Sequence, residues 1–369
     1  MSQPKSVTWK LDPHTKAKHE ILQRYLGAWY PILCNTNERV IFIDGFSGPG
    51  IYSGGEPGSP IIALRAAIEH LANLQNELIF RFYDDILERV KCLEEEISKL
   101  EIPPNYNVVA EHGKFSDKIL KPLEYLESQV NKPIPTFVFI DPFGFKDVRF
   151  DIIRRLLNLQ KCEVLINFNI SGMRRNIDHD DPKTKEHVHN YFDDNDIFEV
   201  IDKYGYKENI LRTFYQKKLE DEAQFVRYFG MENRTGITVY YLFFASNNSL
   251  GHKKMKEAMW RSDPTGEYRF SDRTDENQTI MLIEETVTSN LSTILLNEFK
   301  SFGYIDSEEI TKYVDDKTPF LEKHKNITLR EMENEVRIVV LPENQLTGKK
   351  RRKNSYPSGT MIKFINNIL

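Results

Sequence analysis

The sequence of 369 residues is poor in cysteine and has no long apolar run. Its three cysteines, Cys34, Cys92 and Cys162, have neither the spacing of a CxxC metal motif nor that of a disulfide framework, so we expect buried free thiols. No apolar stretch approaches the ~20 residues that a bilayer crossing requires. The first residues lack the apolar core of a signal peptide, which predicts a cytoplasmic protein without a membrane anchor.

The chain also lacks an excess of positive charge. Its 50 Lys and Arg face 55 Asp and Glu, a net charge of −5, which speaks against a generic nucleic-acid coat. The distribution is uneven, because residues 290–369 carry a net charge of +2 and the first 289 residues carry −7. Five cations of this basic end are consecutive: Lys349, Lys350, Arg351, Arg352 and Lys353.

Hydrophobic residues make up 40% and charged residues 28% of the chain, which is typical of a folded globular protein. Short apolar runs alternate with amphipathic helical patterns, and the runs predict strands near 39–43, 78–83, 107–110, 137–140 and 163–168. Strands separated by helices pair in parallel through right-handed crossovers, so we expect a doubly wound α/β sheet. We interpret 172–235 as a helical insertion, 225–229 and 237–245 as closing strands, and 1–285 and 286–369 as two domains.

The strongest local motif is Phe42-Ile-Asp-Gly-Phe-Ser-Gly-Pro-Gly50, a strand that runs into a glycine loop. Bare backbone at Gly45, Gly48 and Gly50 would let a ligand approach closely. The spacing is not GxGxxG, and no Lys-Ser or Lys-Thr follows, which excludes a P-loop and favours a nucleoside ligand without a polyphosphate. The alternative is an ordinary tight turn.

Three acids follow strands of the predicted sheet: Asp44, Asp84 and Asp141. The carboxyl ends of parallel strands share one edge, where ligands of open α/β sheets bind. An acid at the end of the second strand is placed to hold a ribose diol. The alternatives are a helix cap at Asp84 and a turn at Asp141-Pro142, and no motif in the chain predicts a metal site.

This order of glycine loop, ribose-binding acid and acid–proline–aromatic motif resembles a class I S-adenosylmethionine (SAM)-dependent methyltransferase core. More narrowly, the chain resembles the three-Cys-motif partner family, through the segments Lys18–Tyr25, Phe42–Gly50, Phe137–Phe145 and Met255–Trp260 and through Tyr356-Pro357. The resemblance implies a mostly parallel, seven-stranded, Rossmann-like methyltransferase sheet. It also implies a partner protein that bears three cysteines and resembles radical-SAM proteins.

The resemblance assigns roles to individual residues. It implies cofactor contacts by the loop and the strand ends, namely by Asp44, Gly45, Phe46, Gly48, Gly50, Asp84 and Gly113. Asp141, Pro142 and Phe143 stand where amino-methyltransferases accept hydrogen bonds from an exocyclic amine and stack an extruded base. The second proline of that motif is absent, so a different nucleophile and a cofactor fold without transfer activity are both alternatives.

The basic end reads as three helices (291–302, 306–314 and 319–333) followed by strands at 336–340 and 360–364. This order resembles a winged helix-turn-helix domain, with Lys349–Lys353 as the wing tip. The wing would contact phosphates, and Lys323, Lys325 and Arg330 of the third helix would face a groove, which favours DNA over RNA as the partner. The alternative is a protein–protein module.

Three functions are compatible with the sequence. The first is a SAM-dependent methyltransferase that acts on nucleic acid together with the three-cysteine partner. The second is a catalytically inactive, DNA-binding subunit of a DNA repair or phage-defence complex. The third is a metal-dependent nuclease that uses Asp44, Asp84 and Asp141, a scheme in which the glycine loop has no role.

Overall fold

The computed structural model describes residues 6–72, 74–145, 147–176, 181–263, 269–271 and 280–365. The chain forms two compact units. Met1–Ser262 and Arg269–Thr274 make up the first, and Asp263–Tyr268 and Asp275–Leu369 the second. No helix in the described part of the chain is both long and apolar enough to span a bilayer.

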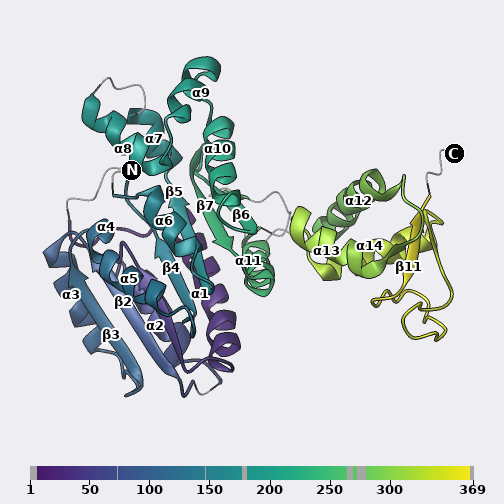
Figure 1. The fold of residues 1–369 in the computed structure, drawn as a ribbon, viewed down its shortest axis with the longest axis horizontal. Coiled ribbons are helices and arrows are strands. Elements are labelled where there is room, and N and C mark those ends of the chain that lie inside the picture. Colours follow the sequence, from purple (N-terminus) through teal and green to yellow (C-terminus); the bar gives the residue numbers. More distant parts are fainter. Residues whose placement is uncertain are drawn as a thin grey trace. The chain divides into compact units, whose positions relative to one another are not determined.

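The first unit is built on an eight-stranded sheet in the order β3-β2-β1-β4-β5-β7-β6-β8 (Figure 1). The strands are β1 (Arg39–Asp44), β2 (Glu77–Asp84), β3 (Tyr106–His112), β4 (Thr136–Ile140), β5 (Cys162–Phe168), β6 (Phe225–Glu232), β7 (Thr238–Ser246) and β8 (Arg269–Ser271). Strands β1 to β5 are parallel, and β7 runs antiparallel to both β5 and β6. The predicted doubly wound, mostly parallel sheet is confirmed. Strand β8, which pairs in parallel with β6, is an eighth strand that the prediction missed.

Helices cover both faces of the sheet. One face carries α1 (Pro13–Cys34), α2 (Ser59–Ile68), α3 (Leu87–Ser98) and α11 (Ser249–Ser262). The other carries α4 (Phe115–Lys118), α5 (Leu120–Ser128), α6 (Phe150–Leu157), α7 (Ile170–Asn176), α8 (Pro182–Phe192), α9 (Asp196–Tyr204) and α10 (Glu208–Glu220). In β1, Phe42 packs into the first layer, and Ile41 and Ile43 pack into the second. The strand is therefore apolar at consecutive positions rather than at alternate ones.

Helix α1 spans 22 residues. Asp12 is the N-cap residue and Pro13 occupies the first turn, where its missing N–H and fixed φ are tolerated. Near its other end, the Tyr25 hydroxyl and the Trp29 indole N–H each donate to Glu163 Oε2 at 2.6 Å. The helix is thereby anchored to the start of β5.

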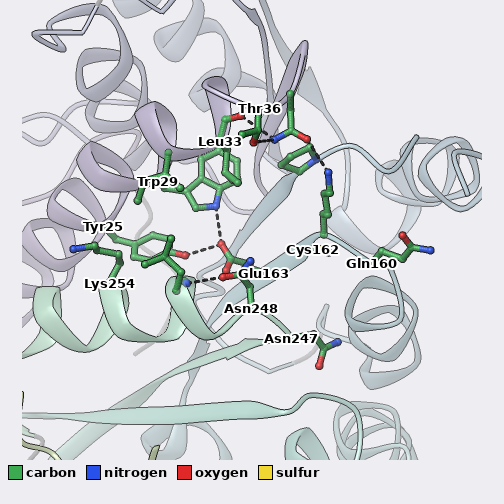
Figure 2. Close-up of a pocket in the computed structure, with 16 residues that line it drawn as sticks. Tyr25, Trp29, Leu33, Thr36, Gln160, Cys162, Glu163, Asn247, Asn248 and Lys254 are labelled. Atoms are coloured by element: carbon green, nitrogen blue, oxygen red, sulfur yellow. Dashed lines mark hydrogen bonds between the residues drawn. The ribbon is translucent and has the colours of Figure 1, made fainter. Parts of the chain in front are cut away.

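Glu163 lies at the amino edge of the sheet, beside a hollow between α1 and α11 (Figure 2). Its Oε1 accepts a third hydrogen bond, from Ser246 Oγ at 2.9 Å. A Cβ at Gly251 would lie 1.8 Å from Oε1, so α11 can pack here only with glycine at that position. Burial raises the pKa of Glu163, and the three donors oppose this rise. The carboxylate joins α1, β5, β7 and α11.

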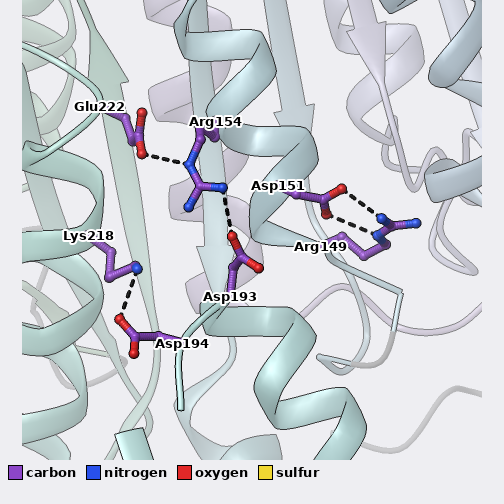
Figure 3. Close-up of polar contacts among 7 residues, drawn as sticks. All are labelled: Arg149, Asp151, Arg154, Asp193, Asp194, Lys218 and Glu222. Atoms are coloured by element: carbon purple, nitrogen blue, oxygen red, sulfur yellow. Dashed lines mark hydrogen bonds and ion pairs between the residues drawn. The ribbon is translucent and has the colours of Figure 1, made fainter. Parts of the chain in front are cut away.

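Helices α7 to α10 form the predicted insertion between β5 and β6, of which residues 177–180 lie outside the described residues. Arg154 of α6 donates to Glu222 at 2.8 Å and to Asp193 at 2.7 Å (Figure 3). Lys218 pairs with Asp194 at 3.0 Å. These partly exposed pairs fasten the loop after α8 to α6 and α10.

The second unit contains three helices and a small antiparallel sheet. Its elements are α12 (Ile280–Phe299), β9 (Ile305–Asp306), α13 (Ser307–Lys317), α14 (Glu322–Asn334), β10 (Ile338–Val340) and β11 (Met361–Phe364). The strand order is β10-β11-β9. Asp306 caps α13 by accepting from the Glu308 N–H at 2.9 Å. The predicted domain boundary after residue 285 falls inside α12.

Candidate functional site

The loop after β1 crosses the carboxyl edge of the sheet. Gly48 and Gly50 have φ angles of 61° and 75°, in a left-handed region that favours glycine. A Cβ at Gly50 would also lie 2.6 Å from Leu93 Cδ1. The Ser47 N–H donates to Tyr83 O at 2.8 Å, which holds the loop against β2. Two of the three predicted glycines are thus required by the backbone itself.

Gly45 serves packing. A Cβ at this position would lie 2.6 Å from the Phe115 ring, and its N–H donates to Phe139 O at 2.9 Å. Phe46, the next residue, lines the cleft above the loop. Gly45 thus packs against a core side chain and Phe46 lines the cleft, and the cofactor contacts of both stay predictions.

Asp44 ends β1 and is fully buried. Its Oδ1 accepts from the Phe46 N–H at 3.1 Å. Its Oδ2 has no partner in hydrogen-bond geometry within the described residues, although the Ser59 hydroxyl is near enough to moderate the pKa. Burial raises the pKa of Asp44 to about 7, because the low-dielectric interior disfavours the charged form.

Asp84 ends β2 and faces the glycine loop. Its Oδ2 accepts from the Gly48 N–H at 3.0 Å and its Oδ1 accepts from the Ile86 N–H at 2.9 Å. The Arg89 guanidinium lies 4.0 Å from Oδ1. Burial raises the pKa of Asp84, and the hydrogen bonds and Arg89 oppose this rise. Asp84 therefore holds the loop, and its ribose contact stays a prediction.

Gly113 follows β3 beside Asp84. Its N–H donates to Asp84 O at 2.9 Å, and its φ of 148° is one that side chains rarely adopt. A Cβ here would lie 2.5 Å from Lys118 Cε. Gly113 thus closes the end of β2 against β3, and its cofactor contact stays a prediction.

Asp141 follows β4 and is surrounded by donors of this chain. Lys18 of α1 forms an ion pair with Asp141 Oδ2, and Asn167 Nδ2 donates to Oδ1 at 2.6 Å. Asn169 Nδ2 donates to the backbone carbonyl of Phe143 at 3.2 Å. A carboxylate and a nearby backbone carbonyl are the two acceptors expected to receive an exocyclic amine. In this structure both accept from side chains.

One cleft connects the glycine loop with this motif. Its walls come from the segment before α1, from α1, from the loop, and from the ends of β4 and β5. The predicted residues that line it are Phe46, Gly48, Gly50, Asp141, Pro142 and Phe143. The other predicted cofactor residues, Asp44, Gly45, Asp84 and Gly113, lie outside its described lining.

Several lining residues had no predicted role: Trp9, Lys18, His19, Asn167, Asn169 and Tyr240. Burial and the adjacent Lys18 lower the pKa of His19 to about 3, so its ring is neutral near pH 7. Lys18 Nζ also lies 5.4 Å from the centre of the Tyr240 ring. Lys18 and His19 belong to a segment that carries the family resemblance, which was the one sequence signal that could have marked them.

The described residues contain no group of three His, Cys, Asp or Glu side chains arranged to hold a metal ion. Of the three acids, Asp141 lines the cleft, Asp44 lies outside its described lining, and Asp84 accepts from the backbone N–H groups of Gly48 and Ile86. This arrangement gives no support to the nuclease alternative.

In the second unit, most of the predicted nucleic-acid residues are exposed. The exposed ones are Lys323 and Arg330 of α14 and Lys349, Lys350, Arg352 and Lys353 of the wing, defined as the loop between β10 and β11. Lys325 is buried, with its ammonium 2.5 Å from Thr311 Oγ1. It therefore packs α14 on α13, which corrects its predicted role as a groove-facing residue.

Arg351 also differs from its prediction. It forms an ion pair with Glu333 of α14, and its side chain is 8% exposed. The Tyr356 hydroxyl donates to the same carboxylate at 2.6 Å. Arg351 thus anchors the wing to α14, while its four neighbours carry the exposed charge.

The order of β1 to β7, with β7 inserted antiparallel between β5 and β6, is that of a Rossmann-like methyltransferase fold. No protein-family model matches the chain, and no curated protein matches it. The resemblance to the three-Cys-motif partner family therefore stays a prediction.

Solved structures with a similar fold include methyltransferases. The O-methyltransferase from Bacillus cereus in complex with S-adenosylhomocysteine (SAH) is 12% identical, covering 64% of this chain and 82% of its own, with a TM-score of 0.36. Human methyltransferase-like protein 13 in complex with SAH is 8% identical, covering 72% and 97%, with a TM-score of 0.33. TrmK from M. capricolum in complex with SAH is 13% identical, covering 82% and 92%, with a TM-score of 0.26. Because these scores are low, the fold class rests on the strand order of this chain.

Proposed function

We propose that this chain is a SAM-dependent methyltransferase that acts on nucleic acid. The observation that carries the proposal is the shared cleft: Gly48 and Gly50 expose bare backbone beside Asp141-Pro142-Phe143 at the carboxyl edge of the sheet. In doubly wound sheets, ligands bind at this edge. The cofactor complexes of proteins with a similar fold are consistent with this choice of ligand.

The cofactor would lie along the glycine loop, and it supplies an electrophilic methyl group when bound. Loop backbone at Gly48 and Gly50 would allow its close approach, and Lys18 and Ser59 offer a cation and a hydroxyl to its amino-acid end. The buried Asp44 lies under the loop with one oxygen outside any hydrogen bond in the described structure. The polar groups present therefore fit an amino-acid group that carries both charges.

The acceptor would be a base extruded from its strand. Asn167, Asn169 and Asp141 offer hydrogen-bonding groups to its edge, and Phe143 and Tyr240 offer apolar ring surface. To reach Asp141, an exocyclic amine must take the place of the Lys18 ammonium. The ion pair thus defines the position that such an acceptor would occupy.

A second function is a subunit that binds the cofactor and DNA without methyl transfer, within a repair or phage-defence complex. The Lys18–Asp141 ion pair favours it, because a cation in the acceptor position satisfies the carboxylate without any substrate. In both cases we propose a three-cysteine-motif protein as the partner, on the basis of the family resemblance.

Titration calorimetry with SAH, followed by transfer of a labelled methyl group to DNA and RNA, separates the two functions. For the enzyme we expect Asp141→Ala to retain SAH binding within a few-fold and to lose about 100-fold or more in transfer rate. Asp84→Ala should lose binding, because it releases the Gly48 N–H. Binding by the wild type without transfer to either nucleic acid would favour the second function, and absence of SAH binding would exclude both.

We further propose that the second unit is a winged helix that docks nucleic acid, with DNA favoured. Its element order, α12-β9-α13-α14 followed by the β10–β11 hairpin with its long loop, supports this assignment. The wing presents four exposed cations, and the Arg351–Glu333 ion pair holds it against α14. Charges of this kind bind the phosphate backbone with little sequence preference.

The salt dependence of DNA affinity tests this docking surface. Replacing Lys349, Lys350, Arg352 and Lys353 together by alanine should reduce the slope of log K against log salt by about 3 to 4, near 0.9 for each lost phosphate contact. Lys91 and Lys121 are exposed cations of the first unit, and their replacement serves as the matched control. An equal change in slope for both variants would remove the wing from the proposal.

A further inference from the structure

The segment before α1 crosses the glycine loop, and Trp9 is its point of contact. The Ser53 N–H donates to Trp9 O at 2.9 Å. The indole meets Phe143 and Tyr52 edge-on, with ring centres 5.1 and 5.7 Å away. On the loop side, a Cβ at Gly48 would lie 3.5 Å from Trp9 Cη2. The ring therefore sits against the loop that is proposed to hold the cofactor.

Arg89 of α3 completes this closure from the other side. Its side chain is 1% exposed. Its guanidinium carbon lies 4.9 Å from the centre of the Trp9 ring and 5.1 Å from that of Phe143. The same guanidinium lies 4.0 Å from Asp84 Oδ1. Trp9, Phe143 and Arg89 thus pack together beside Gly48 and Asp84, where a ribose and its base would bind.

The segment is held mainly through Trp9. Its neighbours Ser6, Val7 and Lys10 are exposed. Among the described residues, one backbone hydrogen bond and a few ring contacts of Trp9 join residues 6–11 to the rest of the first unit. Segments held by so few contacts open locally at a low free-energy cost. A ligand that binds only the open form shifts the population toward it.

We propose that residues 6–12 form a strap whose Trp9 ring closes the nucleoside half of the cleft, so that an adenosine-containing ligand binds only after the strap moves. This inference rests on the proposed cofactor site. Trp9 then sets the apparent affinity for the ligand, because only molecules with an open strap can bind it. The apparent affinity is the intrinsic affinity multiplied by the fraction of molecules in the open form.

Calorimetric titration of SAH into the full-length wild type, Trp9→Ala and Lys10→Ala tests the strap. A strap that is open in about a tenth of molecules predicts that Trp9→Ala binds SAH about tenfold more tightly. Lys10→Ala, an exposed position in the same segment, should bind as the wild type does. Circular dichroism and thermal unfolding of each variant establish that it is folded.

A second measurement follows the ring in the unsubstituted sequence. With 5-fluorotryptophan incorporated, Trp9, Trp29 and Trp260 give separate ¹⁹F resonances, which the Trp9→Ala spectrum assigns. Addition of SAH should move the Trp9 resonance toward the solvent-exposed value. The buried Trp29, at the far end of α1, provides the reference.

Equal or weaker SAH binding by Trp9→Ala, with a stationary Trp9 resonance, would overturn the strap and leave the proposed function intact. Such a result would make Trp9 an ordinary wall of the site. SAH binding by neither the wild type nor Trp9→Ala would overturn the proposed function together with the strap. Tighter binding by Trp9→Ala with unchanged Lys10→Ala supports both.

Discussion

The buried carboxylates at the two edges of the large sheet differ in the number of hydrogen bonds that they accept. At the amino edge, Glu163 accepts hydrogen bonds from Tyr25, Trp29 and Ser246. At the carboxyl edge, the buried Asp44 accepts one within the described residues, from the Phe46 N–H, and the Ser59 hydroxyl lies near it. Burial raises the pKa of both acids. An acid whose oxygens are satisfied by packed side chains serves architecture, whereas an acid left with spare acceptor capacity under a bare backbone loop marks a place for a ligand.

The largest expected effect is at the amino edge. Glu163→Ala leaves a phenol, an indole N–H and a hydroxyl without their acceptor, and should lower the free energy of unfolding by about 3–5 kcal/mol. Urea unfolding followed by tryptophan fluorescence measures this loss in the first unit, which contains all three tryptophans.

Glu257→Ala is the matched control for Glu163→Ala. It removes an acid from the partly exposed pair with Lys254 on the same helix as Gly251, and should cost at most about 1 kcal/mol. A loss of less than about 1 kcal/mol in the free energy of unfolding for Glu163→Ala would show that Glu163 has no special structural role at the amino edge.

The next effect is a pH dependence of stability that arises at the carboxyl edge. The pKa of His19 is lowered from 6.5 to about 3, so the unfolded chain binds the proton more readily. The stability that the neutral ring contributes is lost as pH falls from 6.5 toward 3, by about 2 kcal/mol between pH 7 and pH 5. Unfolding of His19→Asn over this range should lack that loss.

Asp44 acts in the opposite direction. Its pKa is raised from 3.8 to about 7, so the folded chain binds the proton more readily, and its contribution is lost as pH rises through this window. The change is about 2 kcal/mol between pH 5 and pH 7. The wild type should therefore show a nearly flat profile, His19→Asn a fall with rising pH and Asp44→Asn a rise. Flat profiles in both variants would show that neither group is buried in this way.

The smallest effect concerns the loop itself. Gly48→Ala forces a Cβ into a left-handed conformation at φ of 61°, with room for it 3.5 Å from Trp9. We expect a loss of about 1–2 kcal/mol in the free energy of unfolding. Gly144→Ala nearby, with open space at Cβ and no positive φ, is the control. Equal losses for the two variants would show that the loop conformation is not specific to glycine.

The sequence predicted the sheet because its central strands are apolar on both faces, and continuous apolar runs between amphipathic helices leave few alternatives. The acids could be placed at one edge for the same topological reason. Their partners could not, because Lys18 and Asp141 are 123 residues apart and Tyr25 and Glu163 are 138 apart. A lysine within an amphipathic helical pattern is normally predicted to face solvent. For that reason the burial of Lys18 and Lys325 was not predicted.

Strands β8 and β9 were missed for a different reason. They contain three and two residues, too few to show an alternation of apolar and polar positions. Arg351 illustrates a third limit, because nothing in five consecutive cations indicates that the middle one turns inward to Glu333. Local sequence patterns thus predict the helices and strands, whereas the roles of individual side chains depend on contacts between segments that are distant in the sequence.

Helix α1 runs 22 residues, about 33 Å at 1.5 Å per residue, along the large sheet from one edge to the other. In its first half, Lys18 forms an ion pair with Asp141 beside the glycine loop. In its second half, Tyr25 and Trp29 donate hydrogen bonds to Glu163. Because the helix is held at both ends, a displacement at one end is transmitted to the other. A ligand that displaces Lys18 from Asp141 should therefore also disturb the hydrogen bonds of Tyr25 and Trp29 to Glu163. Ligand binding in the cleft should then change the amide hydrogen exchange of residues near Glu163, at the opposite edge of the sheet.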